Sequence, residues 1–494
     1  MMYWNRLLAP VRKRESSMKK TKYDYRSPFK KDFDTICNSS VLRRLQDKAQ
    51  VFPLEEEDYA RTRLTHSIET LSIAESLGIG LKKEILKRKN VQFLSDSDSR
   101  TGYSVRSLVE DIPLILMGAA LLHDMGNPPF GHLSEQAISH WFSENLKRIE
   151  YNVGRNQYEF IDNARNPLSI VLQGRLYEDL THFDGNAQLL RLVTKLSLVV
   201  DENGMNLTYP VMASFIKYPC DSLNIDNQSL LKKKAGFFSS EAPVFYSIVN
   251  ELGLSDGKKI YRHPLAFLVE AADDIAYLTA DIEDAHHKGI ITLEDIDLYL
   301  NTYGEDSELV QRIRKRMKEY KQLAINKNMP KQDDYAMHRL RILIKGEMIN
   351  AIGDVFANHY EEIMNGKCIN ELLSLSTAKP LVAAIRALEK DKVYYCKGIR
   401  DSKIMAEVII KKLLDVYVPC ILNYQKDHDD GKDTENNLIY ESFSANYKYI
   451  CEKGNRGVDD KELIYNKLRL VVDQVSGMTD SRALSVYQIL SAIQ

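Results

Sequence analysis

An adjacent histidine and aspartate directly follow a nearly all-apolar run of the sequence. Residues 112–122 are mostly aliphatic, and His123 and Asp124 come next. Neighbouring side chains on a regular helix point about 100° apart, so both can reach one ion only near a helix end. Imidazole nitrogen and carboxylate oxygen are suitable ligands for Mn, Fe, Mg or Zn. The pair indicates a candidate metal site, although a lone His-Asp pair is common in proteins.

An acidic stripe lies on a long helix that the sequence predicts from His263 to Gly289. Asp273, Tyr277 and Asp281 are spaced four residues apart, so they share one helix face. Further acids crowd the same side or its edge, namely Glu270, Asp274 and Asp284. Such a stripe is either a solvated face or a set of partly buried acids that need a cation, because uncompensated buried carboxylates are costly.

A third element is the segment RTRLTH, residues 61–66. Arg63 and His66 are three residues apart and therefore neighbours on one helix face. Alone, a histidine of this kind is usually a capping or hydrogen-bonding residue. Its occurrence upstream of His123-Asp124 and of the acidic helix favours a metal ligand instead.

The order of these residues resembles the H…HD…D signature of the HD-domain metallophosphohydrolases. Several longer segments are similar to the bacterial deoxyguanosine triphosphate triphosphohydrolases (dGTPases) and together cover roughly residues 26–290. In chain order they are SSVLRRLQDKAQVFPLEEEDYARTRLTHSIE, HDMGNPPFGHLSE, FDGNAQLLRL, GMNLTYPVMASFIKYP and EAADDIAYLTADIEDA. The remaining C-terminal residues resemble that group only diffusely.

The resemblance implies a metal centre and an acid/base pair. Its four metal ligands would be His66, His123, Asp124 and Asp273. His132, with Glu135, would act as acid and base. Proline cannot continue a helix, so the intervening GNPP segment would end the helix and let His132 face the substrate. Glu135 is three residues further on and can orient the imidazole and raise its basicity.

The resemblance also implies a nucleotide pocket. Its substrate-binding residues would be Gln50, Arg63, Asn186, Lys217, Tyr218, Tyr277 and Asp281. Arg63 and Lys217 would bind phosphates, although Lys217 alone is typical of a helix C-terminal cap. Tyr218 and Tyr277 could donate hydroxyls to phosphate or stack on the sugar, where bulk near C2' would reject ribonucleotides. Gln50 would contact the sugar, and Asn186 would line the pocket.

Asp281 has several possible roles on this face. It could anchor Lys217 or Arg63, or it could bind the 3'-hydroxyl of the sugar.

The expected reaction is metal-dependent hydrolysis of dGTP, or of another dNTP, at the α-phosphate. The sequence has no P-loop, so it is not a Walker-type NTPase. The products would be a deoxynucleoside and tripolyphosphate. The cofactor would be Mn²⁺ or Mg²⁺, and Fe would also suit these ligands. Alternatives are another HD-type nucleotide phosphohydrolase, or a sensor of nucleotides or single-stranded DNA. The resemblance further implies a homo-oligomer, expected to be a hexamer, that single-stranded DNA can modulate.

The sequence predicts a mainly α fold, an HD-domain helical core with an additional helical C-terminal region. Expected helices cover residues 38–50, 63–77, 112–124, 186–200, 207–219 and 263–289. Gly78 and Gly80 are expected to end the second of these, and another helix starts at Ser134. Segments read as irregular or exposed are 85–110, parts of 141–185 and 425–437. The expected divisions are a basic arm (1–35), the HD core (36–290) and a C-terminal region (291–494) that completes the pocket and the oligomer contacts.

Composition excludes several classes of protein. The 494 residues carry a formal net charge of −2, which gives no global attraction to nucleic acid or to a membrane. No apolar stretch is long enough to span a bilayer. Six scattered cysteines without a CxxC pair favour a reducing, cytoplasmic compartment. Residues 1–31 hold ten Lys/Arg against two acids. They predict either an arm lying on the protein surface or an arm that binds phosphate or nucleic acid. Trp4, Leu7 and Leu8 resemble a docking segment.

Overall fold

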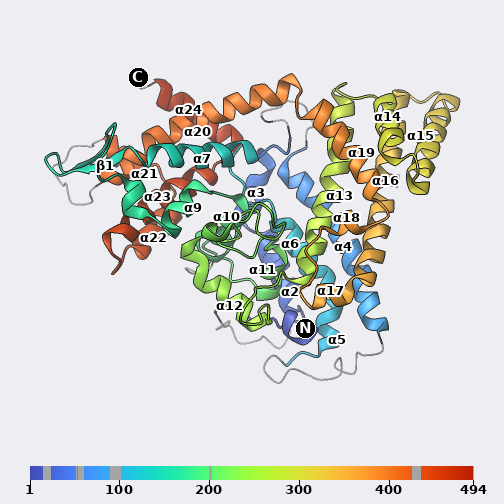
Figure 1. Cartoon of the computed structure of the whole chain (residues 1–494), viewed down its shortest axis with the longest axis horizontal. Coiled ribbons are helices and arrows are strands. Elements are labelled where there is room, and N and C mark those ends of the chain that lie inside the picture. Colours follow the sequence, from blue (N-terminus) through green and yellow to red (C-terminus); the bar gives the residue numbers. More distant parts are fainter. Residues whose placement is uncertain are drawn as a thin grey trace.

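The computed structural model describes residues 1–14, 24–51, 53, 61–88, 102–199, 203–424 and 435–492. Helices dominate this part of the chain, which confirms the mainly α fold (Figure 1). Up to the long helix α13, the elements are α1 (Trp4–Leu7), α2 (Pro28–Cys37), α3 (Ser40–Arg44), η1 (Leu45–Asp47), α4 (Arg63–Lys87), α5 (Val105–Glu110), α6 (Ile112–Leu122), α7 (His132–Asn145), β1 (Ile149–Asn152), β2 (Gln157–Phe160), α8 (Leu168–Leu172), α9 (Arg175–Thr181), α10 (Gly185–Arg191), η3 (Leu192–Leu196), α11 (Tyr209–Phe215), η4 (Ser222–Asn224), η5 (Ser239–Glu241), α12 (Ala242–Leu252) and α13 (Pro264–His287).

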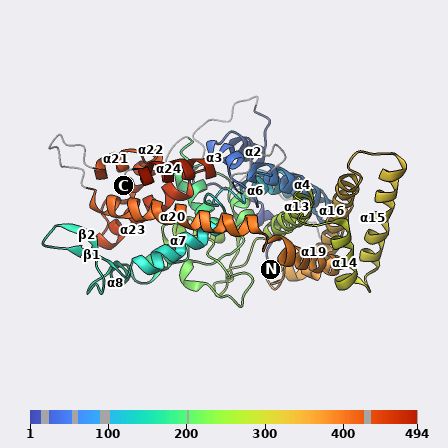
Figure 2. The same ribbon diagram turned by 90° about the horizontal axis from the view of Figure 1, so that it is seen from above.

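The remaining elements form the C-terminal region. They are α14 (Leu293–Gly304), α15 (Glu308–Asn326), α16 (Gln332–Asn358), α17 (Tyr360–Met364), α18 (Leu372–Leu375), α19 (Lys379–Leu388), η6 (Glu389–Val393), α20 (Lys397–Asn423), α21 (Glu435–Glu441), α22 (Ala445–Gly454), α23 (Asp460–Ser476) and α24 (Asp480–Ala492). Helices α14 and α15 project at one end of the molecule, and the long helix α20 runs toward the β1–β2 hairpin at the other (Figure 2). Among the described residues, no helix is long and apolar enough to cross a membrane.

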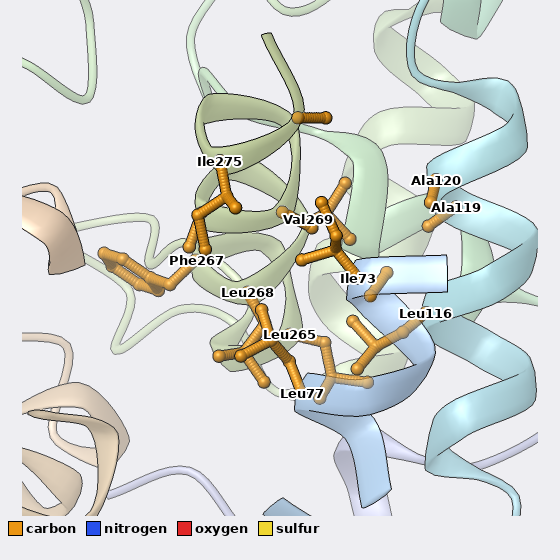
Figure 3. Packing of buried hydrophobic residues seen from close by; sticks show 14 of the residues in the cluster. Ile73, Leu77, Leu116, Ala119, Ala120, Leu265, Phe267, Leu268, Val269 and Ile275 are labelled. Carbon is orange, nitrogen blue, oxygen red and sulfur yellow. The ribbon is translucent and has the colours of Figure 1, made fainter. Parts of the chain in front are cut away.

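Helices α4, α6 and α13 pack against one another at the centre of the larger of two hydrophobic clusters (Figure 3). Ile73 and Leu77 of α4 meet Leu116 of α6, and Leu265 and Leu268 of α13 close the contact (Figure 3). The second cluster contains apolar residues of α7, α20, α23 and α24. Burial of these apolar faces is the main source of stability for helices of this length.

Helix α4 does not end where the sequence predicted. It continues through Gly78 and Gly80 to Lys87. A Cβ atom at Gly78 would lie 2.9 Å from the Cα of Pro113 in α6. The glycine therefore permits close packing of two helices rather than ending one of them, and tertiary contact overrides its low helix propensity.

Several other boundaries differ from the prediction. The helix expected over 38–50 is split into α3 and η1, and the one over 186–200 passes into the π-helix η3 and ends at Leu196. Residues 141–185 contain the antiparallel hairpin β1–β2, in which Ile149 pairs with Phe160. Within 85–110, residues 89–101 lie outside the described residues, but α5 is a helix with buried apolar side chains. Most of the loop expected over 425–437 also lies outside them, and α21 begins at Glu435.

The first residues of the chain are docked in the core. Trp4, Leu7 and Leu8 are buried, as a docking segment predicts. The indole Nε1 of Trp4 donates a hydrogen bond to the hydroxyl of Tyr360 (2.7 Å). Residues 15–23 of the basic arm lie outside the described residues.

Candidate active site

Three helices bring together two imidazoles and one carboxylate. His66 lies on α4, His123 caps the C-terminus of α6, and Asp273 lies on α13. The Oδ1 atom of Asp273 is 3.1 Å from His66 Nε2 and 3.4 Å from His123 Nε2. The three donor atoms lie within 4.8 Å of one another, close enough to share one metal ion.

The chemistry of this group suits a divalent transition metal. His123 Nδ1 donates a hydrogen bond to the carbonyl of Ala120 (2.6 Å), which turns Nε2 toward the site. That Nε2 atom is buried, and no hydrogen-bond partner for it lies among the described residues. Burial lowers the pKa of His123, but the carboxylates of Asp124 and Asp273 outweigh it and raise the pKa to about 9. The site therefore has a negative potential that favours a cation.

Asp124 is oriented by two neighbours. Its Oδ2 accepts a hydrogen bond from Arg63 (2.6 Å), and its Oδ1 accepts one from Asn127 (2.6 Å). Oδ1 also lies 3.7 Å from His123 Nε2. Arg63 was expected to bind phosphate, but it is buried in this ion pair. In this structure it orients a carboxylate at the metal group.

The turn after Asp124 presents a second pair of residues. Phe130 and Gly131 have φ angles of 60° and 63°, and α7 then begins at His132. Nδ1 of His132 donates to Oε2 of Glu135 at 2.6 Å. The side chain of His132 is 67% exposed whereas that of Glu135 is 7% exposed, so the imidazole faces the solvent with the carboxylate behind it.

Electrostatics hold this pair in its charged form. The negative charge of Glu135 and its hydrogen bond raise the pKa of His132. Burial raises the pKa of Glu135, but the charge and hydrogen bond of His132 outweigh it and lower that pKa to about 2. The other oxygen of Glu135 accepts a hydrogen bond from the backbone N–H of Gly185 (2.9 Å) at the start of α10. Lys234 lies 3.5 Å from Glu135 and 2.8 Å from Asp184.

A cavity of about 270 Å³ opens beside both groups. Of the residues that the sequence singled out, its wall contains His123, Asp124, His132, Asn186, Lys217, Tyr218 and Asp273. The wall also contains Glu270 of the acidic stripe, and residues that the sequence analysis did not name include Asn127, Ser214, Lys233, Lys234 and Arg262. The wall thus combines metal donors, the exposed imidazole and several cations, a composition suited to a phosphorylated ligand.

Some predicted residues are not in the cavity wall. His66 and Glu135 lie directly behind it, in contact with Asp273 and His132 respectively. The others outside the wall are Gln50, Arg63, Tyr277 and Asp281.

The expectation that Asp281 anchors Lys217 or Arg63 is wrong. Lys217 pairs with Glu270 (3.2 Å), and Arg63 pairs with Asp124. Asp281 is buried, and burial raises the pKa of its carboxyl to about 8.

The acidic stripe on α13 is largely buried, so the alternative of a solvated face is wrong, and three of its acids are paired with cations. Glu270 accepts a hydrogen bond from Arg262 (2.6 Å), and Asp274 pairs with Arg386 (3.4 Å). Asp284 pairs with Arg61. These cations come from other segments of the chain, so sequence periodicity gave no sign of them. Asp273 differs from its neighbours because its partners are histidines.

The cavity cations missed by the sequence analysis had one visible signal. Lys232, Lys233 and Lys234 form a run of three lysines before the Ala-Gly-Phe-Phe segment. The ammonium of Lys233 lies 6.0 Å from the centre of the Tyr218 ring, and that of Lys217 lies 5.9 Å from it. Two lysines from different segments therefore flank one tyrosine in the cavity.

His66, the adjacent His123 and Asp124, and Asp273 on packed helices form the H…HD…D arrangement of the metal-dependent HD-domain phosphohydrolases. A family model of the HD domain matches residues 63–169, and a model of the phosphohydrolase-associated domain matches residues 437–489.

Comparison with known proteins extends over the whole chain. A deoxyguanosinetriphosphate triphosphohydrolase-like protein of Listeria monocytogenes is 36% identical, with 100% of both chains covered. One of Synechocystis is 29% identical over 100% of both chains. A deoxyguanosinetriphosphate triphosphohydrolase of Yersinia enterocolitica is 29% identical over 96% of this chain and 95% of its own. The chain belongs to the family of deoxyguanosinetriphosphate triphosphohydrolase-like proteins and is a phosphohydrolase.

Proposed function

We propose that this phosphohydrolase cleaves dGTP, and other dNTPs more slowly, into a deoxynucleoside and tripolyphosphate. The observation that carries the proposal is the convergence of the metal-donor group and the His132–Glu135 pair on one cation-rich cavity. The printed names of the full-length relatives supply the substrate class. A triphosphate carries several negative charges, and the lysines of the cavity match them.

The lysines of the cavity would bind the triphosphate. Lys217, Lys233 and Lys234 all line the wall, and the ring of Tyr218 lies about 6 Å from the ammonium groups of the first two. Arg63 supports this arrangement indirectly because its ion pair orients Asp124. The roles proposed for the sugar side are contacts by Gln50, Asn186, Tyr277 and Asp281.

The metal would be held by His66, His123, Asp124 and Asp273. A bound divalent ion would polarise the α-phosphate and neutralise charge as water attacks. Two imidazoles in the donor set favour Mn²⁺ or Fe²⁺ over Mg²⁺, which prefers oxygen ligands.

His132 would move the proton in this reaction. Water forms the new bond to the α-phosphorus and releases a proton to the solvent, and the bond to the 5'-oxygen breaks. The leaving 5'-oxygen must then take up a proton. Glu135 raises the pKa of His132 and so favours its imidazolium form, in which Nε2–H is a suitable donor. Glu135 holds the other ring nitrogen and stabilises the charge.

The remaining proposals rest on the resemblance and on composition. We propose a cytoplasmic homo-oligomer, a hexamer, whose activity single-stranded DNA modulates. Residues 291–494 would complete the pocket and supply contacts between subunits. A sensor of nucleotides or single-stranded DNA is the second candidate, favoured by the basic composition of residues 1–31.

Product analysis tests the proposed reaction. The protein is incubated with each dNTP and rNTP plus Mn²⁺ or Mg²⁺, and products are separated by ion exchange with mass detection. We expect deoxyguanosine and tripolyphosphate from dGTP, with much slower turnover of ribonucleotides. Release of orthophosphate or diphosphate would show another HD-type phosphohydrolase, and no turnover with any nucleotide would favour the sensor.

Two variants test the division of roles. Asp273→Ala should lose bound metal and activity together, whereas His132→Ala should keep metal and nucleotide binding but lose turnover by roughly 10²–10⁴-fold. His140→Ala is a matched control, because His140 lies exposed on the same helix α7 and outside the cavity. Near-normal kcat in His132→Ala would show that another group transfers the proton.

A further inference from the structure

A C-terminal segment, residues 473–480, contacts two parts of the chain that hold the His132–Glu135 pair. One is the turn before His132, and the other is helix α10, whose first residue binds Glu135. We propose that Asp480 is a positioning residue, which clamps the turn that presents His132 to the substrate. The inference rests on the proposed function, because it assigns His132 the proton transfer described above. It gives a role to a residue inside the matched phosphohydrolase-associated domain, residues 437–489.

Asp480 binds two backbone groups that are distant in sequence. Its Oδ1 accepts a hydrogen bond from the N–H of Phe130 (2.9 Å), and its Oδ2 accepts one from the N–H of Ala49 (2.9 Å). Phe130 is two residues before His132. The carboxylate is 2% exposed, so both bonds are shielded from water. Hydrogen bonds to a charged, buried acceptor are stronger than those between neutral groups.

The turn needs such a clamp because its backbone is strained. Phe130 has a φ of 60°, which is unfavourable for a residue with a Cβ atom. Gly131 has a φ of 63°, and a Cβ atom there would lie 2.3 Å from the Nη2 atom of Arg63. Strained turns of this kind persist only where the surroundings hold them. The bond from Asp480 holds the turn at its most strained non-glycine residue.

Lys48 fixes the start of the same turn. Its Nζ donates to the carbonyl of Asn127 (2.6 Å) and to the carbonyl of Ser476 (3.0 Å). Asn127 in turn donates to Asp124 of the metal group. The turn is therefore held at Phe130 directly by Asp480, and at Asn127 by Lys48, which is itself bonded to Ser476.

Helix α10, which holds Glu135, also contacts residues 473–480. Asp473 accepts hydrogen bonds from Gln188 (2.9 Å) and from Arg191 (2.7 Å) on α10. The first residue of α10, Gly185, donates to Glu135. The red helices α21–α24 lie mostly on the left of Figures 1 and 2, and the residue after α23 reaches α3, where Arg44 donates a hydrogen bond to the carbonyl of Gly477 (3.1 Å). Residues 473–480 thus hold His132 through the turn at Phe130, and they hold Glu135 through helix α10.

The decisive variant is Asp480→Asn, which keeps the shape of the side chain but offers one acceptor oxygen instead of two. Asp459→Ala is the matched control, since Asp459 caps α23 in the same region by accepting from the N–H of Glu462 (2.8 Å) and makes no contact with the turn. Hydrogen–deuterium exchange of peptides spanning residues 125–133 reports the clamp directly, because the amide of Phe130 is the bonded group. Kinetics, bound metal and Tm are measured on the same samples.

We expect roughly tenfold faster exchange of the turn amides in Asp480→Asn, about the effect of losing one charge-assisted hydrogen bond. We also expect a fall in kcat of similar size, with KM and metal content within about twofold of wild type. Asp459→Ala should lower Tm by a comparable amount without either effect. The split between kcat and KM separates a positioning role from a general loss of stability.

Three outcomes would overturn the proposal. They are unchanged exchange in Asp480→Asn, faster exchange with an unchanged kcat, and equal effects in Asp459→Ala. If the wild type hydrolyses no nucleotide, the proposed function fails, and the exchange measurement still decides by itself whether Asp480 holds the turn.

Discussion

At the scale of single residues, the histidines of the site differ in role because their neighbours differ. His66 and His123 converge on Asp273, whereas His132 is paired with Glu135 and faces the cavity. The raised pKa of His132 follows from its contact, because the buried carboxylate of Glu135 stabilises the imidazolium beside it. This makes the pH dependence of the reaction a test of the assignment.

The pH profile of kcat should change when Glu135 is neutralised. The raised pKa of His132 means that its imidazolium, and activity with it, is lost only as pH rises through that pKa. In Glu135→Gln the carboxylate is gone, so the pKa of His132 falls and the alkaline limb of kcat should move to lower pH. The limb should stay in place in Glu144→Gln, because Glu144 pairs with the exposed His140 instead. An alkaline limb that does not move in Glu135→Gln would exclude His132 as the proton donor.

At the scale of elements, close packing of three helices brings the candidate metal ligands together. Helices α4, α6 and α13 each provide one donor of the group, and their apolar faces fix the spacing (Figure 3). At Gly78 the two helices α4 and α6 are so close that an added Cβ would lie 2.9 Å from the Cα of Pro113. Gly80 lies on the same helix, but an added Cβ there would have no described atom within 4 Å.

These two glycines predict opposite effects of the same substitution. Gly78→Ala forces α4 away from Pro113 and should lower the free energy of unfolding by about 1–3 kcal/mol, the usual effect of overpacking. Gly80→Ala should raise it by up to about 1 kcal/mol, because alanine is the better helix former. Urea denaturation followed by circular dichroism measures both. Equal effects of the two substitutions would contradict the packing argument.

At the scale of the whole molecule, the C-terminal helices are tied to the HD core by buried charges. Arg191 on α10 pairs with Asp473 on α23 at 2.7 Å and with Glu241 at 3.1 Å. All three side chains are buried, and Arg469 lies 3.6 Å from Asp473. A buried ion pair need not add net stability, but removal of one partner leaves the other charge uncompensated.

Asp473→Ala should therefore destabilise the protein strongly. The loss should be about 3 kcal/mol in the free energy of unfolding, because Arg191 keeps only Glu241 as a charged partner. Glu319→Ala removes half of an exposed pair with Arg316 on α15 and should change stability by less than about 1 kcal/mol. Denaturant titration of the full chain compares the two. A loss in Asp473→Ala no larger than in Glu319→Ala would show that this network does not join the regions.

Much of the fold could be predicted because it depends on local patterns. The apolar run before His123 predicted α6, and the spacing of Asp273, Tyr277 and Asp281 predicted one face of α13. The boundaries were predicted less well. Gly78 was taken as a helix end, since a sequence does not show that another helix packs there. The β1–β2 hairpin was missed because its strands are only four residues long.

The sequence by itself determined the residue types that can do chemistry: the histidines, the acids and the turn before His132. Their types and spacing are local, and local spacing is what a sequence shows. Only the tertiary structure decided which charges meet. It paired Arg63 with Asp124 and Lys217 with Glu270, and it brought Asp480 to the turn before His132. Such pairs join segments up to 350 residues apart, and they form only when the packing of apolar faces has brought those segments together.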